Sequence, residues 1–235
     1  MTRFHRLALV VFAAFGSTAA ARADLVATFN GTIPSQDVAM QAFAQVFAAN
    51  PVGPFRFTVT PASGDPTFAP NSAIRAFCAD LFQDVSPGQT YTYTVGGIGD
   101  LPSVGGDATK QALVRRLFNR HYETATDADR GGAFQLALWE LLYDGPGNLN
   151  LGTGNVTVST PDSVPAVGIA KAWLAALETA DPTDADKYQL VGLFSATAQD
   201  QITVVPSAVP APAGMVLGLI AVAGFGLRRL RRKAA

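Results

Sequence analysis

The chain has 235 residues, of which 49% are hydrophobic and 15% charged, a composition that excludes a disordered or fibrous chain. Three of its 17 basic residues lie in the first 23 positions and five in the last eight, which leaves nine basic against 18 acidic residues between the ends. This acidic central part argues against nucleic acid and anionic lipid as partners, because both are bound through Lys and Arg.

The first 23 residues have the features of a secretory signal peptide. Arg3 and Arg6 form a basic start, Leu7 to Phe15 is apolar, and Ala21-Arg22-Ala23 is a small-x-small cleavage site. We expect cleavage after Ala23. An uncleaved anchor is the alternative, but the apolar run is shorter than the roughly 20 residues that cross a bilayer.

Residues 24–95 are predicted to form strands and one helix. Apolar alternation predicts strands at Asp24–Phe29, Phe55–Thr60, Ile74–Phe82 and Thr90–Val95. The helical spacing of Val38, Met40, Phe43, Val46 and Phe47 predicts a helix over Asp37–Ala49. The turn Ser86-Pro87-Gly88 predicts a hairpin between the strands on either side.

Residues 107–205 are predicted to be mainly helical. A helix over Asp107–Tyr122 has Asp107 as its cap, an apolar stripe of Ala112, Leu113, Leu117 and Phe118, and Arg115, Arg116 and Arg120 facing water. Further helices are predicted at Ala128–Tyr143 and Val164–Thr179, and strands at Asn155–Ser159, Tyr188–Phe194 and Gln201–Val205. Helices and strands do not alternate regularly, so residues 24–205 are predicted to be one α+β domain. Its antiparallel strands would form a sandwich or a barrel-like sheet, with three to four helices packed to one side.

The C-terminal 30 residues read as a linker followed by a membrane-sorting tail. Residues 206–212 are proline-rich and contain Val209-Pro210-Ala211-Pro212, and residues 213–235 form an apolar helix that ends in five basic residues. This order resembles the PEP-CTERM class of sorting signals, although Ala211 stands where that class usually has Glu. The resemblance implies processing by an exosortase-type enzyme in a Gram-negative bacterium, after transient anchoring in the inner membrane with the basic end inside. A permanent anchor that is never cut is the alternative.

The few histidines and the single cysteine exclude several kinds of site. His5 lies in the signal and His121 is the other histidine, so zinc sites built from several His or Cys are excluded. We predict neither a metal nor a cofactor. A hydrolase that pairs Cys78 with His121 is a remote alternative. The acidic run from Asp127 to Gly131 faintly resembles a calcium loop, but Leu138 occupies the position of the required Glu, which favours a helix cap.

Two polar residues occupy positions that the hydrophobic pattern predicts to be buried. Cys78 lies in the strand segment Phe77-Cys78-Ala79-Asp80, where a buried apolar thiol is the ordinary reading. Gln135 lies in a helix that is apolar nearly all round, on the same face as Leu138, Trp139 and Leu142. Burying its amide unpaired would cost roughly 1–3 kcal/mol, so it needs a partner, either a backbone carbonyl, a water or something more specific.

A Phe-Cys-x-Asp strand followed by a Phe-Gln-x-Ala-x-Trp helix resembles the Cys–Gln thioester domains of bacterial surface proteins. The resemblance covers roughly Phe77 to Tyr143, and Gly154–Val158 and Ala198–Gln201 also resemble members with PEP-CTERM-type tails. It implies that Cys78 and Gln135 join in an internal thioester, with Asp80, Trp139 and Glu140 as candidate accessory residues. Asp80 and Glu140 would orient groups or accept protons, and Trp139 would exclude water.

The implied function is a single covalent attachment and not enzymatic turnover. An amine, typically a Lys of a partner protein, would displace Cys78 and form an amide with Gln135, and glycan hydroxyls are a second class of target. The protein would then act at the cell surface or in the extracellular matrix. The alternative is a structural matrix or envelope protein in which the pair is unreactive.

Overall fold

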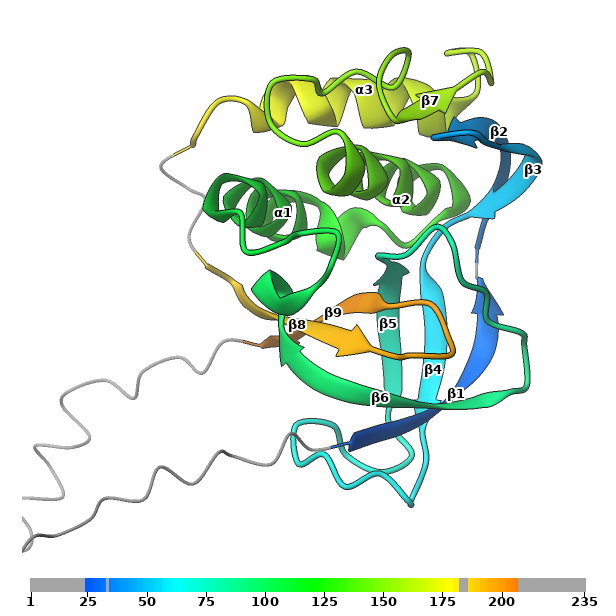
Figure 1. Ribbon diagram of the computed structural model, residues 1–235, viewed down its shortest axis with the longest axis vertical. Helices are drawn as coiled ribbons and strands as arrows, with labels where there is room; N and C mark the ends of the chain where they lie inside the picture. The colour runs from blue at the N-terminus through cyan, green and yellow to red at the C-terminus, as the bar shows by residue number, and fades with distance from the viewer. Residues whose placement is uncertain (1–23, 33, 182–185, 207–235) are drawn as a thin grey trace, which may run out of the picture.

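The computed structural model describes residues 24–32, 34–181 and 186–206, and within them the protein is α+β, as predicted. Six antiparallel strands close a barrel in the order β1-β4-β5-β9-β8-β6. Three further strands form a small sheet in the order β3-β2-β7, beside the α-helices α1, α2 and α3 (Figure 1). The signal, the sorting motif and the tail fall on residues 1–23 and 207–235, outside the described part, and stay predictions.

The barrel strands are β1 (Asp24–Thr32), β4 (Phe55–Val59), β5 (Ala73–Cys78), β6 (Thr90–Gly97), β8 (Tyr188–Phe194) and β9 (Gln201–Pro206). The predicted strands in these places are confirmed, but the predicted hairpin around Pro87 is wrong. β5 pairs with β4 and β9, whereas β6 pairs with β1 and β8. Eleven residues, 79–89, separate β5 from β6, and this connection crosses to another part of the barrel instead of turning back.

The small sheet contains β2 (Gln36–Ala42), β3 (Gln45–Val52) and β7 (Val156–Val158). The helix predicted over Asp37–Ala49 is therefore wrong, because this segment is the β2–β3 hairpin. Val38, Met40 and Ala42 are buried at every second position, and the hairpin turns at Phe43. The apolar residues that follow the turn completed the helical spacing in the sequence. One of them, Val46, is 72% exposed in the strand.

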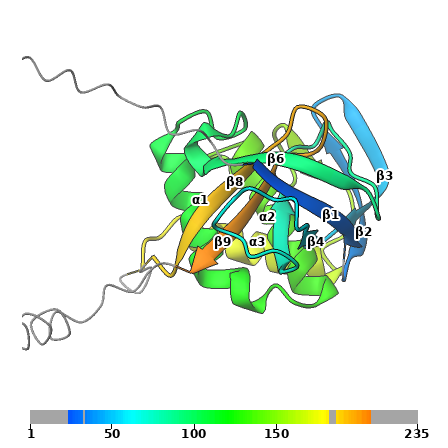
Figure 2. The same cartoon turned by 90° about the horizontal axis from the view of Figure 1, so that it is seen from below.

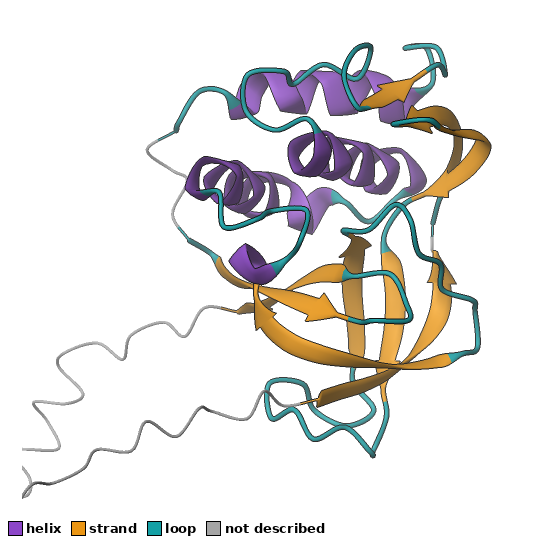
Figure 3. Cartoon of the chain, viewed as in Figure 1, coloured by secondary structure: helices purple, strands orange, loops and turns teal. Residues whose placement is uncertain are grey.

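The helices cover one end of the barrel, where the layer of helices lies above the layer of strands (Figure 3). They are α1 (Ala108–His121), α2 (Ala128–Tyr143) and α3 (Pro165–Leu177), with short 3-10 turns at Ile98–Asp100 and Tyr122–Thr124. The view from below shows the barrel strands in front of the helices (Figure 2). Asp107 caps α1 as predicted, but Ala112 is exposed, and Val114 takes its place in the buried stripe. Arg116 and Arg120 donate to carbonyl groups near the end of α3 instead of only facing water.

The hydrophobic residues form two cores. One fills the barrel with residues that include Leu25, Phe29, Phe57 and Tyr93. The other lies between the barrel and the helices and includes Phe77, Cys78, Phe118 and Phe134. Helix α2 supplies much of this second core, because its residues from Gly131 to Leu142 are all buried.

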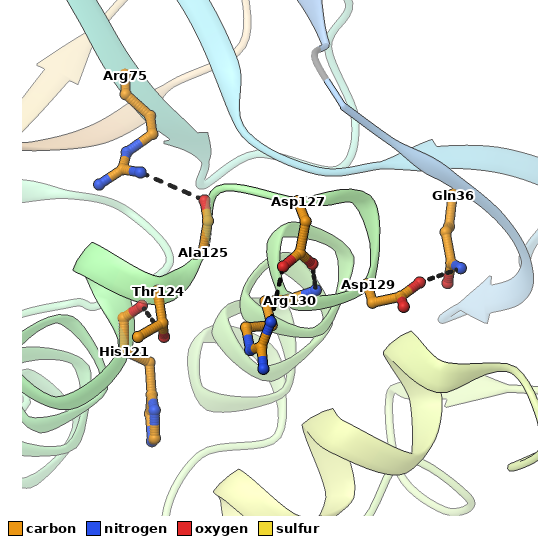
Figure 4. A network of polar contacts seen from close by, with 8 residues as sticks. All are labelled: Gln36, Arg75, His121, Thr124, Ala125, Asp127, Asp129 and Arg130. Carbon is orange, nitrogen blue, oxygen red and sulfur yellow. Dashed lines mark hydrogen bonds and ion pairs between the residues drawn. The ribbon is translucent and has the colours of Figure 1, made fainter.

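Polar contacts fix the N-terminal end of α2 (Figure 4). The Asp127 carboxylate accepts a hydrogen bond from the Arg130 backbone at 2.7 Å and pairs with its guanidinium at 2.8 Å, so the predicted helix cap is confirmed. Asp129 accepts a hydrogen bond of 2.6 Å from Gln36 of β2. Gly131 lies so close to Pro54 that a Cβ would stand 2.6 Å from the proline ring. These contacts set the position along the barrel at which α2 presents its side chains.

Candidate functional site

Cys78 and Gln135, 57 positions apart in sequence, meet in the core between the barrel and α2. The Cys78 backbone N–H donates to Gln135 Oε1 at 2.9 Å, and Gln135 Nε2 donates to the Cys78 carbonyl oxygen at 2.8 Å. Both residues are completely buried. The Gln135 amide is therefore held along the backbone of the residue that carries the thiol. This reciprocal pair is the partner that the sequence required for the buried amide.

The end of β5 explains why the Cys78 backbone is available for this contact. The register pairs Cys78 with Gln201 of β9, and β5 ends at Cys78. Ala79 continues toward β9 by donating its N–H to the Asp200 carbonyl oxygen at 2.8 Å. The side-chain amide of Gln135 thus supplies the hydrogen bonds that a neighbouring strand would otherwise give to Cys78.

Three side chains of α2, spaced four residues apart, face the segment that contains Cys78. Gln135 contacts the Cys78 backbone, and Trp139 lies beside the thiol. The Tyr143 hydroxyl donates to the Ala79 carbonyl oxygen at 3.1 Å and accepts from the Leu81 N–H at 3.2 Å. Residues at i, i+4 and i+8 lie on one helix face, so a single helix orders the whole segment from Cys78 to Leu81.

The Cys78 thiol is protonated at neutral pH. Burial raises its pKa to about 12, although a hydrogen bond to the sulfur from the backbone at Asp80 and the nearby Trp139 N–H both act to lower it. The sulfur lies 2.8 Å from the Asp80 carbonyl oxygen, to which it donates. Among the described residues the Trp139 Nε1 makes no hydrogen bond of ordinary geometry, so its N–H stays available to the sulfur. A buried neutral thiol resists alkylation and oxidation.

The candidate accessory residues lie in different surroundings. The Asp80 carboxylate accepts a hydrogen bond of 2.8 Å from the Phe82 N–H and faces a surface pocket. Glu140 is buried on another face of α2, where Oε1 accepts a hydrogen bond of 2.6 Å from the Asn150 N–H. Burial raises the pKa of Glu140 to about 8. Its hydrogen bond thus ties the loop after α2 to the helix instead of reaching Cys78.

A pocket of about 580 Å³ opens beside the segment that follows Cys78. Its lining includes Ala79, Asp80, Phe82, Tyr143 and Asp200. Burial raises the pKa of Asp200, and the neighbouring Asp80 adds to this effect against the hydrogen bond from the Ser195 N–H. No local pattern in the sequence pointed to Tyr143 and Asp200 as site residues, because only the fold brings β9 and the end of α2 to β5.

The contacts of His121 are those of a residue with a structural role. Its ring stacks on Trp173 of α3 at a centroid distance of 4.0 Å, and no hydrogen bond links it to Cys78 in the described part of the chain. Burial, with a smaller effect from Arg120, lowers its pKa to about 4. The described residues contain no cluster of three or more His, Cys, Asp or Glu suited to hold a metal ion, and no helix with the length and apolar character to cross a membrane.

The sequence matches no family model and no curated protein. The fold is similar to a solved structure described as the N-terminal thioester domain of a surface protein from Clostridium perfringens, with a TM-score of 0.39. The similarity covers 72% of this chain and 99% of that chain, at 13% sequence identity. This identity is too low to transfer site residues from one chain to the other.

Proposed function

We propose that this chain is an exported surface or matrix protein in which Cys78 and Gln135 form an internal thioester for one covalent attachment to a partner. The observation that carries the proposal is the reciprocal pair of hydrogen bonds between the Gln135 amide and the Cys78 backbone. A packed core holds the two groups in one arrangement, and such positioning is a large part of the rate of intramolecular reactions.

The arrangement supports thioester formation by direct attack. The Cys78 sulfur attacks the Gln135 side-chain amide carbon, the carbon–nitrogen bond breaks, and the thiol proton leaves with the nitrogen as ammonia. The Cys78 N–H already donates to Oε1, the atom on which negative charge develops during the attack. Because the thiol is neutral at physiological pH, its proton is available for the leaving nitrogen.

The same surroundings would keep the bond intact until a partner arrives. A thiol of high pKa is a poor leaving group, so the burial that raises the pKa of Cys78 also slows attack by stray nucleophiles. Trp139, 3% exposed, excludes water from the sulfur. When an amine attacks, a new carbon–nitrogen bond forms at Gln135, the carbon–sulfur bond breaks, and the amine proton returns to Cys78.

A second candidate is a structural protein in which the pair is never joined. The two hydrogen bonds of the Gln135 amide favour it, because they satisfy the buried side chain without any covalent step. In this case α2 would be held to β5 by hydrogen bonds alone. The cysteine would then stay a free buried thiol.

Export and surface attachment are the remaining parts of the proposal. They are supported by the signal-like residues 1–23 and by the PEP-CTERM-like tail after Val209. Processing by an exosortase-type enzyme would release the domain from the inner membrane of a Gram-negative bacterium. A single use per molecule, without turnover, follows from the conversion of Gln135 into a stable amide.

Methylamine labelling tests the covalent proposal. We expect methylamine to add to the native exported protein and the modified peptide to contain Gln135, with a new free thiol at Cys78. Cys78→Ala should remain unlabelled, and His121→Ala should be labelled like the wild type, whereas a hydrolase would need His121. If Cys78 is already a free thiol in the denatured, untreated protein and no methylamine is incorporated, the structural candidate holds instead.

A further inference from the structure

An aromatic rim lies beside the pocket next to Cys78, formed by Phe43 of the β2–β3 turn, Phe82 and Tyr143. The Phe43 ring centroid lies 5.7 Å from that of Phe82 and 5.9 Å from that of Tyr143, and the latter two rings are 6.1 Å apart. Phe82 and Tyr143 also line the pocket. The rim therefore joins a distant hairpin to the pocket beside the segment that follows Cys78.

Phe43 is placed there at a cost in stability. Its φ is +53°, in the left-handed region where a bulky side chain is strained. Glycine or asparagine would take this conformation more easily. Phe43 is 46% exposed and Phe82 is 55% exposed, so burial does not compensate for the strain. A strained and exposed aromatic residue at a pocket indicates a binding role.

Two carboxylates lie behind the rim. Asp80 and Asp200 both line the pocket, and each has one oxygen occupied by a backbone N–H, from Phe82 and Ser195 respectively. No described residue donates a hydrogen bond to the second oxygen of either group. An ammonium group that enters the pocket would meet two hydrogen-bond acceptors, and both carry the charge opposite to its own. It could also pass along the faces of the aromatic rings.

We propose that the aromatic rim and the Asp80–Asp200 pair recognise a lysine that is flanked by apolar residues in a partner polypeptide. This inference rests on the proposed thioester and specifies its target. The flanking residues pack on Phe43 and Phe82, while the lysine enters the pocket. One carboxylate takes a proton from the ammonium group, and the neutral amine then attacks the thioester carbonyl carbon. Charge complementarity favours a lysine over a neutral glycan, which would also fit an aromatic surface.

The test compares three probes on the full exported protein: methylamine, a peptide with one lysine between two leucines, and the same peptide with serines in place of the leucines. We expect the leucine peptide to couple faster than the serine peptide. Phe43→Asn should slow coupling of the leucine peptide about tenfold, in line with the loss of aromatic and apolar contacts. The methylamine rate should not change, because so small a probe does not reach the rim.

Matched controls separate recognition from folding. Phe43→Asn relieves the backbone strain, so its melting temperature should equal or exceed that of the wild type. Phe82→Ser should slow coupling of the leucine peptide as well, and Val46→Asn, on the same hairpin but outside the rim, should not. Asp80→Asn with Asp200→Asn should slow both lysine peptides, whereas Asp37→Asn should have no effect.

The outcomes distinguish the two proposals. If methylamine labels Phe43→Asn and Phe82→Ser like the wild type but Phe43→Asn leaves the ratio of the two peptide rates unchanged, the rim inference is overturned and the thioester stands. The rim inference is also overturned, and the thioester again stands, if a neutral oligosaccharide couples faster than the leucine peptide and Phe43→Asn slows that coupling. If methylamine does not label the wild type, both proposals fall together.

Discussion

The interior of the barrel and the layer between the barrel and the helices are equally well buried, but they contain different kinds of groups. Phe29, Phe57 and Tyr93 fill the barrel with packed rings. The layer under the helices contains the thiol of Cys78, together with Gln135 and Glu140, all completely buried. Burying polar groups costs free energy unless they are paired, so a fold selected for stability alone would favour the first kind of core. The barrel interior is thus packed with rings, whereas the layer under the helices holds the groups on which the proposed chemistry depends.

The largest effect that would test this division is expected from Phe57→Ala. Phe57 packs against the rings of Phe29 and Tyr93, and removing it should lower the free energy of unfolding by about 4 kcal/mol. Urea unfolding measures this loss. The protein that remains folded should still take up methylamine to the wild-type extent, because the barrel interior does not contact the Gln135 amide. A folded variant without labelling would show that the two regions act together.

Gln135→Met, in the layer under the helices, should change both the stability and the labelling. It fills a similar volume but leaves both the N–H and the carbonyl group of Cys78 without their partners, at a cost of about 3 kcal/mol. Methylamine labelling should be abolished. Leu136→Met, at the neighbouring buried position, should cost less than about 1.5 kcal/mol and keep the labelling. Equal stability of the two variants in urea would show that the pair of hydrogen bonds contributes nothing.

Glu140→Gln should change the pH dependence of stability. Burial raises the pKa of Glu140 from 4.5 to about 8, so the folded protein favours the neutral carboxyl group. The unfolded chain releases this proton near pH 4.5, and the wild type should therefore lose stability as the pH rises from 4.5 to about 8. At pH 8 the variant should be more stable by about 2 kcal/mol. Urea unfolding at pH 5 and pH 8 checks this, and an identical pH dependence of the two proteins would contradict it.

The smallest effect is expected from Tyr143→Phe. This change removes the hydroxyl that bridges Ala79 and Leu81, and should lower the free energy of unfolding by about 1 kcal/mol. The fraction of molecules with a thioester should also fall, because the segment after Cys78 is held less firmly. Tyr91→Phe, which removes a hydroxyl that accepts a hydrogen bond from the Ser86 N–H, serves as the control and should leave that fraction unchanged. The same fraction in both variants would exclude a positioning role for Tyr143.

Local patterns in the sequence predicted one side of the candidate site well. The bounds of α2, its Asp127 cap and the burial of Gln135 follow from helical periodicity and capping, which depend on neighbouring residues. The other side depends on strand pairing. Asp200 reaches the pocket because β9 pairs with β5, and Phe43 reaches the rim because the segment predicted as a helix is a hairpin. Such long-range pairing leaves little trace in local periodicity.

The intact mass of the mature exported protein tests the central claim most directly. If the thioester forms, the wild-type chain should be lighter by one ammonia than the mass calculated from its sequence. The Cys78→Ala and Gln135→Met chains should each have the full mass calculated from their sequences. A wild-type chain at its full sequence mass, with a thiol at Cys78 that is alkylated once the protein is denatured, would contradict the internal thioester.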